Sequence, residues 1–521
     1  MAPLSTKKLT LIPTATFIFL LLLSSPCAPF VHSDFAGLES LKVSPSEFIG
    51  SVRKVGNVLQ KVISSLKSES FSFGNDNNYF GLCDAISTCL DLLDLVADDL
   101  SWSISAVQSP QGKHNSTGNL SSDLRTWLSA ALANADTCMD GFEGSNGNVR
   151  GLISTGIDQA KSLLQKILTQ VKPVNLDKCS RSRSRNSIPS WIEPGDKKLL
   201  QTKEVGVDAV VAADGTANFT TVMDAVHAAP MYSMKRYVIY IKKGVYTEKV
   251  EINKNKWNLV MIGDGMDDTV ITGNLSYTTN LTTFKTATFG VNGRGFIARD
   301  ISFRNTAGPK RKQAVALRSN SDLSVFYRCG IYGYQDSLYA HSLRQFYRDC
   351  KISGTVDFIF GHANAVFQNC TILVKKGLPK QKNTITAQGE IDPTRSSGFS
   401  IQFCNISADY DLLPYVNTTS TYLGRPWKPY SRTIFMQSNI SGVLSPEGWL
   451  EWNGSLYLDT LYYAEYNNYG PGARLENRVK WPGYHVINDS SKAFNFTVAN
   501  MILGDLWLPS TGVRFTPGFG N

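Results

Sequence analysis

The first half of the chain carries apolar side chains at the spacing of an α-helix. Between residues 45 and 172 they recur every three or four positions, so that each helix would have one apolar face. Such stripes, separated by polar segments, predict an all-α four-helix bundle. The stripes are Val52, Val55, Leu59, Val62 and Leu66; Leu93, Val96, Leu100, Ile104 and Val107; Leu124, Leu128 and Leu132; and Ile157, Ala160, Leu164, Ile167 and Val171.

After Gln201 the helical period disappears, and short β-rich runs alternate with glycine and asparagine. A repeat runs through this half: an apolar residue, then Cys, Ser or Arg three positions later, then Ile two positions further on. Steps of 21 and 20 residues, with longer ones of 30 and 34, fit one coil per repeat with loops in the longer coils. The copies start at Phe326, Tyr347, Phe367, Ile401 and Phe435, with an earlier copy at Phe296.

This repeat predicts an all-β parallel β-helix, whose coils stack about 4.8 Å apart. A β-sandwich is the alternative, but it predicts successive hairpins rather than one residue type at a fixed phase. In a β-helix, Cys329, Cys350 and Cys370 would be neighbours in one column. Their Cα atoms would then lie within the roughly 4.4–6.8 Å that disulfides span. The pattern leaves open which two of them pair.

The repeat also places two acidic residues at the same phase of neighbouring coils. Asp336 and Asp357 each follow the cysteine of their own copy by seven residues. Stacking would hold the carboxylates roughly 5 Å apart at the backbone, and two such close carboxylates resist ionising together. One can then act as nucleophile or base while the other carries a proton. Gln313 and Gln335 would stack similarly, where their amides can donate to an oxyanion.

An acidic ladder on a solvated coil is the alternative for these two residues, because such ladders are common in β-solenoids. The aromatic surroundings favour an active site, since sugar rings pack on aromatic side chains and a plain ladder does not need them. The flanking aromatic residues are Tyr334, Tyr339, Phe358 and Phe360.

The N-terminal segment has the features of a secretory signal. Lys7 and Lys8 precede an apolar run at residues 17–23, and Val31-His32-Ser33 fits the small-residue rule for cleavage. A signal anchor is the alternative, but the run is short for a bilayer. Exported chains form disulfides and carry N-linked glycans. The Asn-X-Ser/Thr acceptors include Asn115, Asn119, Asn218, Asn274, Asn280, Asn417, Asn439, Asn453 and Asn495.

Residues 173–203 read as a linker, because alternating Ser and Arg, followed by Pro189 and Pro194, disfavour packing. It ends near Lys197-Lys198, a candidate site for a processing protease, with a solvated basic run as the alternative. The net charge of +9 favours a polyanionic partner. Export makes that partner an acidic polysaccharide rather than a nucleic acid.

Segments of residues 205–521 together resemble plant pectin methylesterases in order and spacing. They are 244–248 (GVYTE), 313–318 (QAVALR), 333–339 (GYQDSLY), 354–361 (GTVDFIFG) and 423–427 (LGRPW). The fold of that family is a right-handed parallel β-helix, in agreement with the repeat.

The resemblance implies a role for each matching residue. Asp357 corresponds to the nucleophile, and Asp336 to the general acid that later acts as base. Gln313 and Gln335 correspond to the amide donors around the oxyanion, and Arg425 to the guanidinium that holds the nucleophilic carboxylate. The implied reaction needs no metal or organic cofactor. The predicted substrate-binding residues are Thr283, Gln313, Arg425, Trp427, Tyr339 and Phe358, and the family disulfide maps to Cys350–Cys370.

The helical half resembles the inhibitor-like pro-region that precedes many plant enzymes of this family. The matching segments are 89–94 and 136–142, and the family pairs Cys89 with Cys138. The usual N-terminal cysteine pair is absent, and Cys83 is additional. The resemblance raises the hypothesis that this region inhibits the enzyme. The predicted parts are a signal peptide (1–33), a pro-region (34–172), a linker (173–203) and a catalytic domain (204–521).

The resemblance places the expected protein in the plant cell wall, and a monomer is the default expectation. Its partners would be methylesterified pectin, its own pro-region or separate inhibitor proteins, and a processing protease. A pectate lyase or polygalacturonase is the first rival, since both use β-helices, but a lyase would require a calcium-binding acidic cluster. The second rival is a pectin-binding protein without catalysis, which the complete set of active-site residues disfavours.

Overall fold

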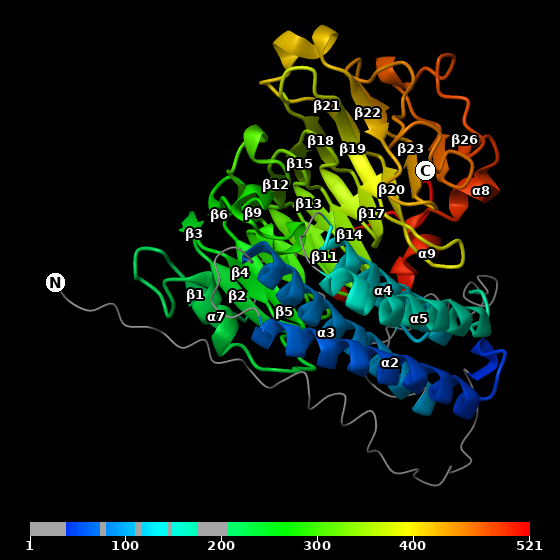
Figure 1. Ribbon diagram of the computed structural model, residues 1–521. Coiled ribbons are helices and arrows are strands. Elements are labelled where there is room, and N and C mark those ends of the chain that lie inside the picture. Colours follow the sequence, from blue (N-terminus) through cyan, green and yellow to red (C-terminus); the bar gives the residue numbers. More distant parts are fainter. Residues whose placement is uncertain (1–37, 73–79, 110–116, 144–147, 175–205, 521) are drawn as a thin grey trace.

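The computed structural model describes residues 38–72, 80–109, 117–143, 148–174 and 206–520. The predicted signal peptide and the Lys197-Lys198 site lie outside these residues. A helical bundle comes first along the chain and a long β-structure follows it (Figure 1). Within the described ranges, no helix is both long enough and apolar enough to cross a membrane.

The bundle consists of α2 (Pro45–Ser72), α3 (Phe80–Gln108), α4 (Leu120–Asp140) and α5 (Val149–Gln170), after a short 3-10 turn at Leu38–Ser40. All of the apolar stripe residues predicted from the sequence are buried, which confirms the four-helix prediction. The disulfide Cys89–Cys138 joins α3 to α4, as the family resemblance implies. At the start of α4 the side chain of Asn119 accepts a hydrogen bond from the Ser122 N–H, which caps the helix.

The β-structure is a parallel β-helix of three sheets, in which every strand pairing is parallel. The first sheet contains β1 (Ala209–Val211), β2 (Tyr237–Ile241), β5 (Leu259–Gly263), β8 (Ile297–Arg299), β11 (Ser324–Tyr327), β14 (Arg344–Arg348), β17 (Asn364–Gln368), β20 (Gly398–Gln402), β23 (Arg432–Met436), β25 (Tyr462–Tyr466) and β26 (Tyr484–Val486). The second contains β4 (Val250–Ile252), β7 (Phe289–Val291), β10 (Leu317–Ser319), β13 (Leu338–Ala340), β16 (Ile359–Gly361), β19 (Asn383–Gln388) and β22 (Thr421–Gly424). The third contains β3 (Gly244–Thr247), β6 (Thr269–Gly273), β9 (Ser302–Asn305), β12 (Gly330–Tyr332), β15 (Lys351–Gly354), β18 (Thr371–Val374), β21 (Asn405–Ala408) and β24 (Asn439–Ile440).

The strand register confirms the repeat from Phe326 onward. The leading residues of successive copies, Phe326, Tyr347, Phe367, Ile401 and Phe435, are direct neighbours. The isoleucines of the copies form a second column, Ile331, Ile352, Ile372, Ile406 and Ile440. The earlier copy was wrong by two residues, because Phe326 pairs with Ala298 rather than Phe296. Likewise Ile331 pairs with Phe303 rather than Ile301.

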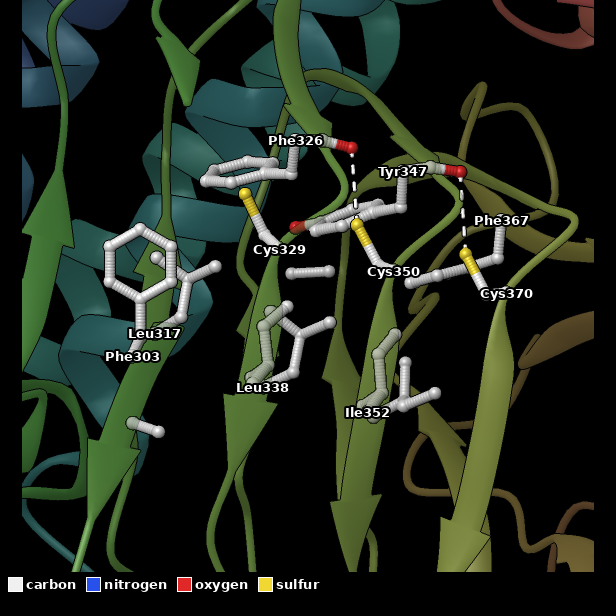
Figure 2. Packing of buried hydrophobic residues seen from close by; sticks show 14 of the residues in the cluster. Phe303, Leu317, Phe326, Cys329, Leu338, Tyr347, Cys350, Ile352, Phe367 and Cys370 are labelled. Carbon is white, nitrogen blue, oxygen red and sulfur yellow. Dashed lines mark hydrogen bonds between the residues drawn. The ribbon is translucent and has the colours of Figure 1, made fainter. Parts of the chain in front are cut away.

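The cysteines of the repeat stack in one column but are not bonded to one another. Cys350 and Cys370, the pair expected from the family, are both free thiols. Each thiol instead donates to a carbonyl one coil back, Cys350 to Phe326 (3.2 Å) and Cys370 to Tyr347 (3.6 Å) (Figure 2). In a parallel stack both Cα–Cβ bonds point the same way, so the Cβ atoms stay near the ~4.8 Å coil spacing rather than the ~3.8 Å of disulfides.

Short helices close the open surfaces of the β-helix. At its N-terminal end α7 (Val222–Ala228) packs on β1 and β4, and the Glu248 carboxylate accepts from the first N–H groups of this helix. At the other end of the chain α8 (Ser490–Phe494), α9 (Val498–Met501) and α10 (Gly504–Trp507) follow the last strand. Val498, Ile502 and Trp507 pack against the outer face of the first sheet, which therefore is covered.

The bundle lies along one flank of the β-helix (Figure 1). Its apolar core is continuous with side chains on the outer face of the second sheet, among them Tyr339 and Phe360. On either side of this contact, charged residues of α3 and α4 pair with lysines and arginines of the β-helix. The side of the β-helix that the bundle covers is the side on which the acidic pair lies.

Candidate active site

Most of the predicted site residues lie on the turns that lead from the third sheet into the second, here called the front turns. Tyr339 lies instead on β13, and Arg425 and Trp427 follow β22. The front turns are residues 248–249, 274–288, 306–316, 333–337, 355–358, 375–382 and 409–420. The two that carry Asp336 and Asp357 are short, and longer turns flank them on both sides. Consecutive coils of a β-helix therefore present these side chains side by side.

The register places Asp336 directly beside Asp357, as the repeat predicts. Leu338 pairs with Ile359, and the Asp336 N–H donates to the Val356 carbonyl at 3.1 Å. Both aspartates have left-handed backbones, with φ of 63° and 51°, a conformation that is uncommon outside glycine, asparagine and aspartate. Both side chains are almost fully buried.

The two carboxylates are held very differently. Arg425 grips Asp357 with two hydrogen bonds, Nε to Oδ1 at 2.9 Å and Nη2 to Oδ2 at 2.6 Å. Thr384 accepts from the Asp357 N–H (2.9 Å) and donates to its Oδ1 (2.6 Å). Asp336 has no such partner among the described residues. A bidentate arginine favours a charged, fixed carboxylate at Asp357.

The surroundings of Asp336 favour the protonated carboxyl group, whereas those of Asp357 favour the charged carboxylate. Burial raises the pKa of Asp336 well above its usual value, and the charge of Asp357 raises it further, against a lowering effect of Arg425. A carboxyl group in this state keeps a proton that it can donate. The pair therefore contains one charged carboxylate for attack and one carboxylic acid for proton transfer.

Gln313 and Gln335 lie on neighbouring front turns, next to the pair. The Ala314 N–H donates to the Gln335 carbonyl at 3.2 Å, which ties the two turns together. The Oε1 atom of Gln313 is buried without a hydrogen-bond partner. Such an amide is expected to bond to a group that the site receives.

Aromatic side chains form a surface beside the acidic pair. Tyr339 and Phe360 stack with ring centroids 4.1 Å apart, and Phe360 meets Trp427 edge-on at 5.9 Å. Phe358 does not belong to this surface, contrary to the prediction, because it is fully buried in the interior of the β-helix. It precedes β16, which begins at Ile359, so strand alternation does not place it on the face of Phe360.

The helical bundle covers this aromatic surface. Thr137 of α4 lies 3.5 Å from the Tyr339 hydroxyl and 3.0 Å from His341 Nε2. Thr283 follows Thr282, whose N–H donates to Asp84 of α3 at 2.7 Å. Beside Trp427, the Lys428 ammonium pairs with Asp136 at 3.0 Å and Asp140 at 2.8 Å of α4.

Some neighbours of the site have no signal in the sequence pattern. Thr384 reaches Asp357 from β19, and the spacing between these two residues follows no step of the repeat. Trp452 lies under the Arg425 guanidinium, 4.4 Å from its ring centroid to the guanidinium carbon. A site residue that does not belong to the repeat can be identified only from the three-dimensional stacking of the coils. Within the described part of the chain, no cluster of His, Cys, Asp and Glu is arranged to hold a metal ion.

Comparisons with known proteins agree with this geometry. The pectinesterase family profile matches residues 208–505, and the plant invertase/pectin methylesterase inhibitor profile matches residues 31–171. A pectinesterase/pectinesterase inhibitor from Prunus persica is 62% identical over 95% of this chain and 94% of its own length. A probable pectinesterase/pectinesterase inhibitor from Arabidopsis thaliana is 56% identical over 96% and 97%.

Among solved structures, pectin methylesterase from carrot is 51% identical and superposes with a TM-score of 0.60, covering 61% of this chain and 100% of the carrot chain. The pectin methylesterase from Aspergillus niger is 29% identical, with a TM-score of 0.51, and covers 59% of this chain and 96% of its own. The chain belongs to the pectinesterase family, with a pectin methylesterase inhibitor-like domain in front of the β-helix.

Proposed function

We propose that the β-helix hydrolyses the C6 methyl esters of pectin through an acyl-enzyme on Asp357. The observation that carries the proposal is the asymmetry of the acidic pair. Arg425 and Thr384 fix Asp357 as a charged carboxylate, whereas Asp336 has a raised pKa. Similarity to pectinesterases over nearly the whole chain supports the substrate.

In the proposed reaction Asp357 Oδ attacks the ester carbonyl carbon, and the carbonyl oxygen becomes an oxyanion. The amides of Gln313 and Gln335 donate to this oxyanion. The C–O bond to the methoxy group breaks, and Asp336 donates its proton so that methanol leaves. A water molecule then gives one proton to Asp336 while its oxygen attacks the acyl carbon of the mixed anhydride. The bond from that carbon to Asp357 breaks, which restores the Asp357 carboxylate and releases the uronic acid, whose proton passes to solvent to leave uronate.

Methanol release from highly methylesterified pectin tests this proposal, with the 201–521 fragment as the enzyme. The carrot enzyme supports the use of this fragment, because its whole chain corresponds to the β-helix part alone. Asp357→Asn is expected to lower the rate by at least about a thousandfold, because it removes the nucleophile. Asp336→Asn is expected to lower it by about 10²–10⁴. Equal rates in parent and Asp357→Asn would contradict the mechanism.

The same experiment separates the rival reactions. Methanol release without chain shortening is expected, whereas new reducing ends would indicate a polygalacturonase or a lyase. Binding of pectin without any methanol would indicate a non-catalytic pectin-binding protein.

We also infer that the bundle inhibits the β-helix while it is attached. Supporting this, the bundle packs over Tyr339 and Phe360 and pairs with Lys428 beside Trp427, the surface proposed to receive the sugar rings together with Thr283. The full chain should therefore release methanol more slowly than the fragment. Equal specific activities would contradict inhibition.

This scheme agrees with the predicted division into signal peptide (1–33), pro-region (34–172), linker (173–203) and catalytic domain (204–521). A secreted monomer in the cell wall, processed by a protease after Lys197-Lys198, would be the active form. N-terminal sequencing of the protein secreted by a plant cell tests this. A first residue far from Gln201 would rule out processing at that site.

A further inference from the structure

Two front turns beyond the catalytic pair form an exposed basic surface with tyrosines. Residues 375–382 and 409–420 occupy the coils that follow the Asp357 turn. Lys380 and Lys382 are exposed, as are Tyr410 and Tyr415, at 85% and 42%. Together with Lys376 they are called here the lysine–tyrosine patch.

Two acidic residues of the second turn bond to the first turn and so fix the two turns to each other. Asp411 Oδ1 accepts from the Lys376 N–H at 3.0 Å. Asp409 and Asp411 also pair with the Lys375 ammonium at 3.0 and 3.5 Å. Their charges are therefore directed to Lys375, whereas the ammonium groups of Lys376, Lys380 and Lys382 have no carboxylate partner among the described residues.

Tyrosine rings hold two of these ammonium groups in place. Lys376 Nζ lies 3.3 Å from the centroid of Tyr415, and Lys382 Nζ lies 6.0 Å from that of Tyr422. Cation–π contacts of this kind orient an ammonium group without neutralising its charge. The patch therefore keeps its positive charge and its aromatic surface together.

The patch is continuous with the catalytic pair on two sides. Lys375 Nζ lies 5.5 Å from the ring of Tyr334, which directly precedes Gln335. Tyr422 lies on β22, and the chain leaves this strand directly into Arg425, the partner of Asp357. A polymer that lies on the catalytic turns would thus meet the patch on the following coils.

The patch also remains exposed while the bundle is docked. The fractional exposures above hold with the bundle in place. The bundle makes its contacts elsewhere, for example at Thr282, Tyr339 and Lys428. The patch is therefore available in the full-length chain, unlike the aromatic surface beside the acidic pair.

We propose that the lysine–tyrosine patch binds a stretch of de-esterified uronate units, the product of the proposed reaction. This inference rests on the proposed function, because that reaction converts neutral methyl esters into carboxylates. Each new carboxylate can pair with an exposed ammonium group, and the tyrosines offer apolar faces to the sugar rings. The patch therefore holds the product part of a polymer while the catalytic pair faces its neighbouring part.

The test measures binding of de-esterified homogalacturonan oligomers to the full-length chain. The patch variant is K376Q/K380Q/K382Q, and the matched control K235Q/K243Q/K492Q removes the same charge at exposed positions away from the front turns. The patch variant should bind at least about tenfold more weakly, and the control less than about twofold more weakly. Equal losses in both variants would overturn the proposal.

The tyrosines give an independent measurement. Y410A/Y415A should weaken binding several-fold without changing the salt dependence, because it removes contact surface and no charge. The unfolding temperature of each variant checks that the fold is intact. A Y410A/Y415A variant that binds as tightly as the parent would overturn the role of the tyrosines and leave only an ionic surface.

Two further probes separate the possible sources of the effect. Fully methylesterified oligomers should bind the parent and the patch variant equally. Dextran sulfate is the second probe. If its affinity falls from the parent to the patch variant by as much as that of the uronate oligomers, the patch binds anions in general and uronate recognition is overturned.

The patch and the proposed function can also fail separately. Lost uronate binding together with no methanol release by the 201–521 fragment would retain the patch and reject the esterase. Methanol release by the fragment, together with uronate binding that is the same in the parent and the patch variant, would retain the esterase and reject the patch.

Discussion

The interior of the β-helix and its contact with the bundle differ in how much charge they bury. The interior is stacked from apolar columns, in which Ile331, Ile352 and Ile372 repeat the same contact from coil to coil. The bundle contact also has an apolar centre, which includes Tyr339 and Phe360, but charged pairs are buried around that centre. Arg344, for example, lies between Asp322 of the β-helix and Asp123 of α4, both at 2.7 Å.

This difference indicates which contact can be reversed. Apolar columns gain stability from every coil and contain no group that water would solvate. Buried ion pairs lose hydration on docking and regain it on release, so their net contribution is small while the loss of one partner is large. The β-helix is thus expected to persist alone, whereas the bundle contact includes pairs that can be broken one at a time.

The largest expected effect comes from breaking an interior column. Phe326→Ala removes a fully buried ring that stacks on Tyr347 at 4.9 Å. We expect it to lower the free energy of unfolding by about 3–5 kcal/mol, measured by denaturant unfolding of the 201–521 fragment. Val245→Ala, at an exposed position, is the control and should change it by less than about 0.5 kcal/mol. Similar effects of both variants would contradict the column model.

The next effect is on docking alone. Lys254 of the β-helix pairs with Asp94 and Asp98 of α3, both at 2.9 Å. Lys254→Met leaves these carboxylates unpaired only while the bundle is docked, so docking should weaken by about 3–5 kcal/mol. Methanol release by the full chain should then rise toward that of the fragment.

Lys243→Met, which changes an exposed lysine away from the bundle contacts, is the matched control for Lys254→Met. The unfolding temperature of the 201–521 fragment should be the same with and without Lys254→Met. If the full chain carrying Lys254→Met is no more active than the parent, the ion pairs do not hold the bundle.

The sequence predicts the interior far better than the contact. The isoleucine column and the phase of Asp336 and Asp357 follow from spacing alone, because each coil repeats its neighbour. Neither Lys254 nor Thr384 could be predicted, because the partners of Lys254 lie in the other domain and because the spacing from Thr384 to Asp357 follows no step of the repeat. Phe358 was misplaced because its closeness to Asp357 along the chain does not determine on which side of the coil its side chain lies, and the side chain lies in the interior.

A smaller effect is expected from pH. Burial raises the pKa of Asp98 to about 6, partly offset by Lys254, and burial raises that of Asp140 to about 6, partly offset by Lys428. Released into water, both would return toward about 3.9. The docked state therefore binds protons more tightly, and docking should weaken as pH rises from 4 to 6, by up to about tenfold per pH unit for each proton.

The rate of the full chain relative to the fragment, measured between pH 4 and 6.5, checks this expectation. The ratio should rise with pH, and D98N/D140N should flatten its rise. The carboxyl of Asp136 has a lowered pKa and does not titrate in this window. A ratio that falls with rising pH would contradict the assignment.

The smallest expected effect is that of a reductant on the β-helix. Its repeat uses cysteine where a small side chain must donate to the coil below, and Ser438 makes the same bond, to the Ile401 carbonyl at 3.3 Å. Cysteine at this position is therefore a hydrogen-bond donor rather than half of a disulfide. Reductant should leave the unfolding temperature of the 201–521 fragment unchanged, and alkylation of the unfolded fragment should label Cys329, Cys350, Cys370 and Cys404. Labelling of only two, with a lower unfolding temperature after reduction, would instead support the Cys350–Cys370 bond of the family. The column would then hold its coils by a covalent link as well as by packing.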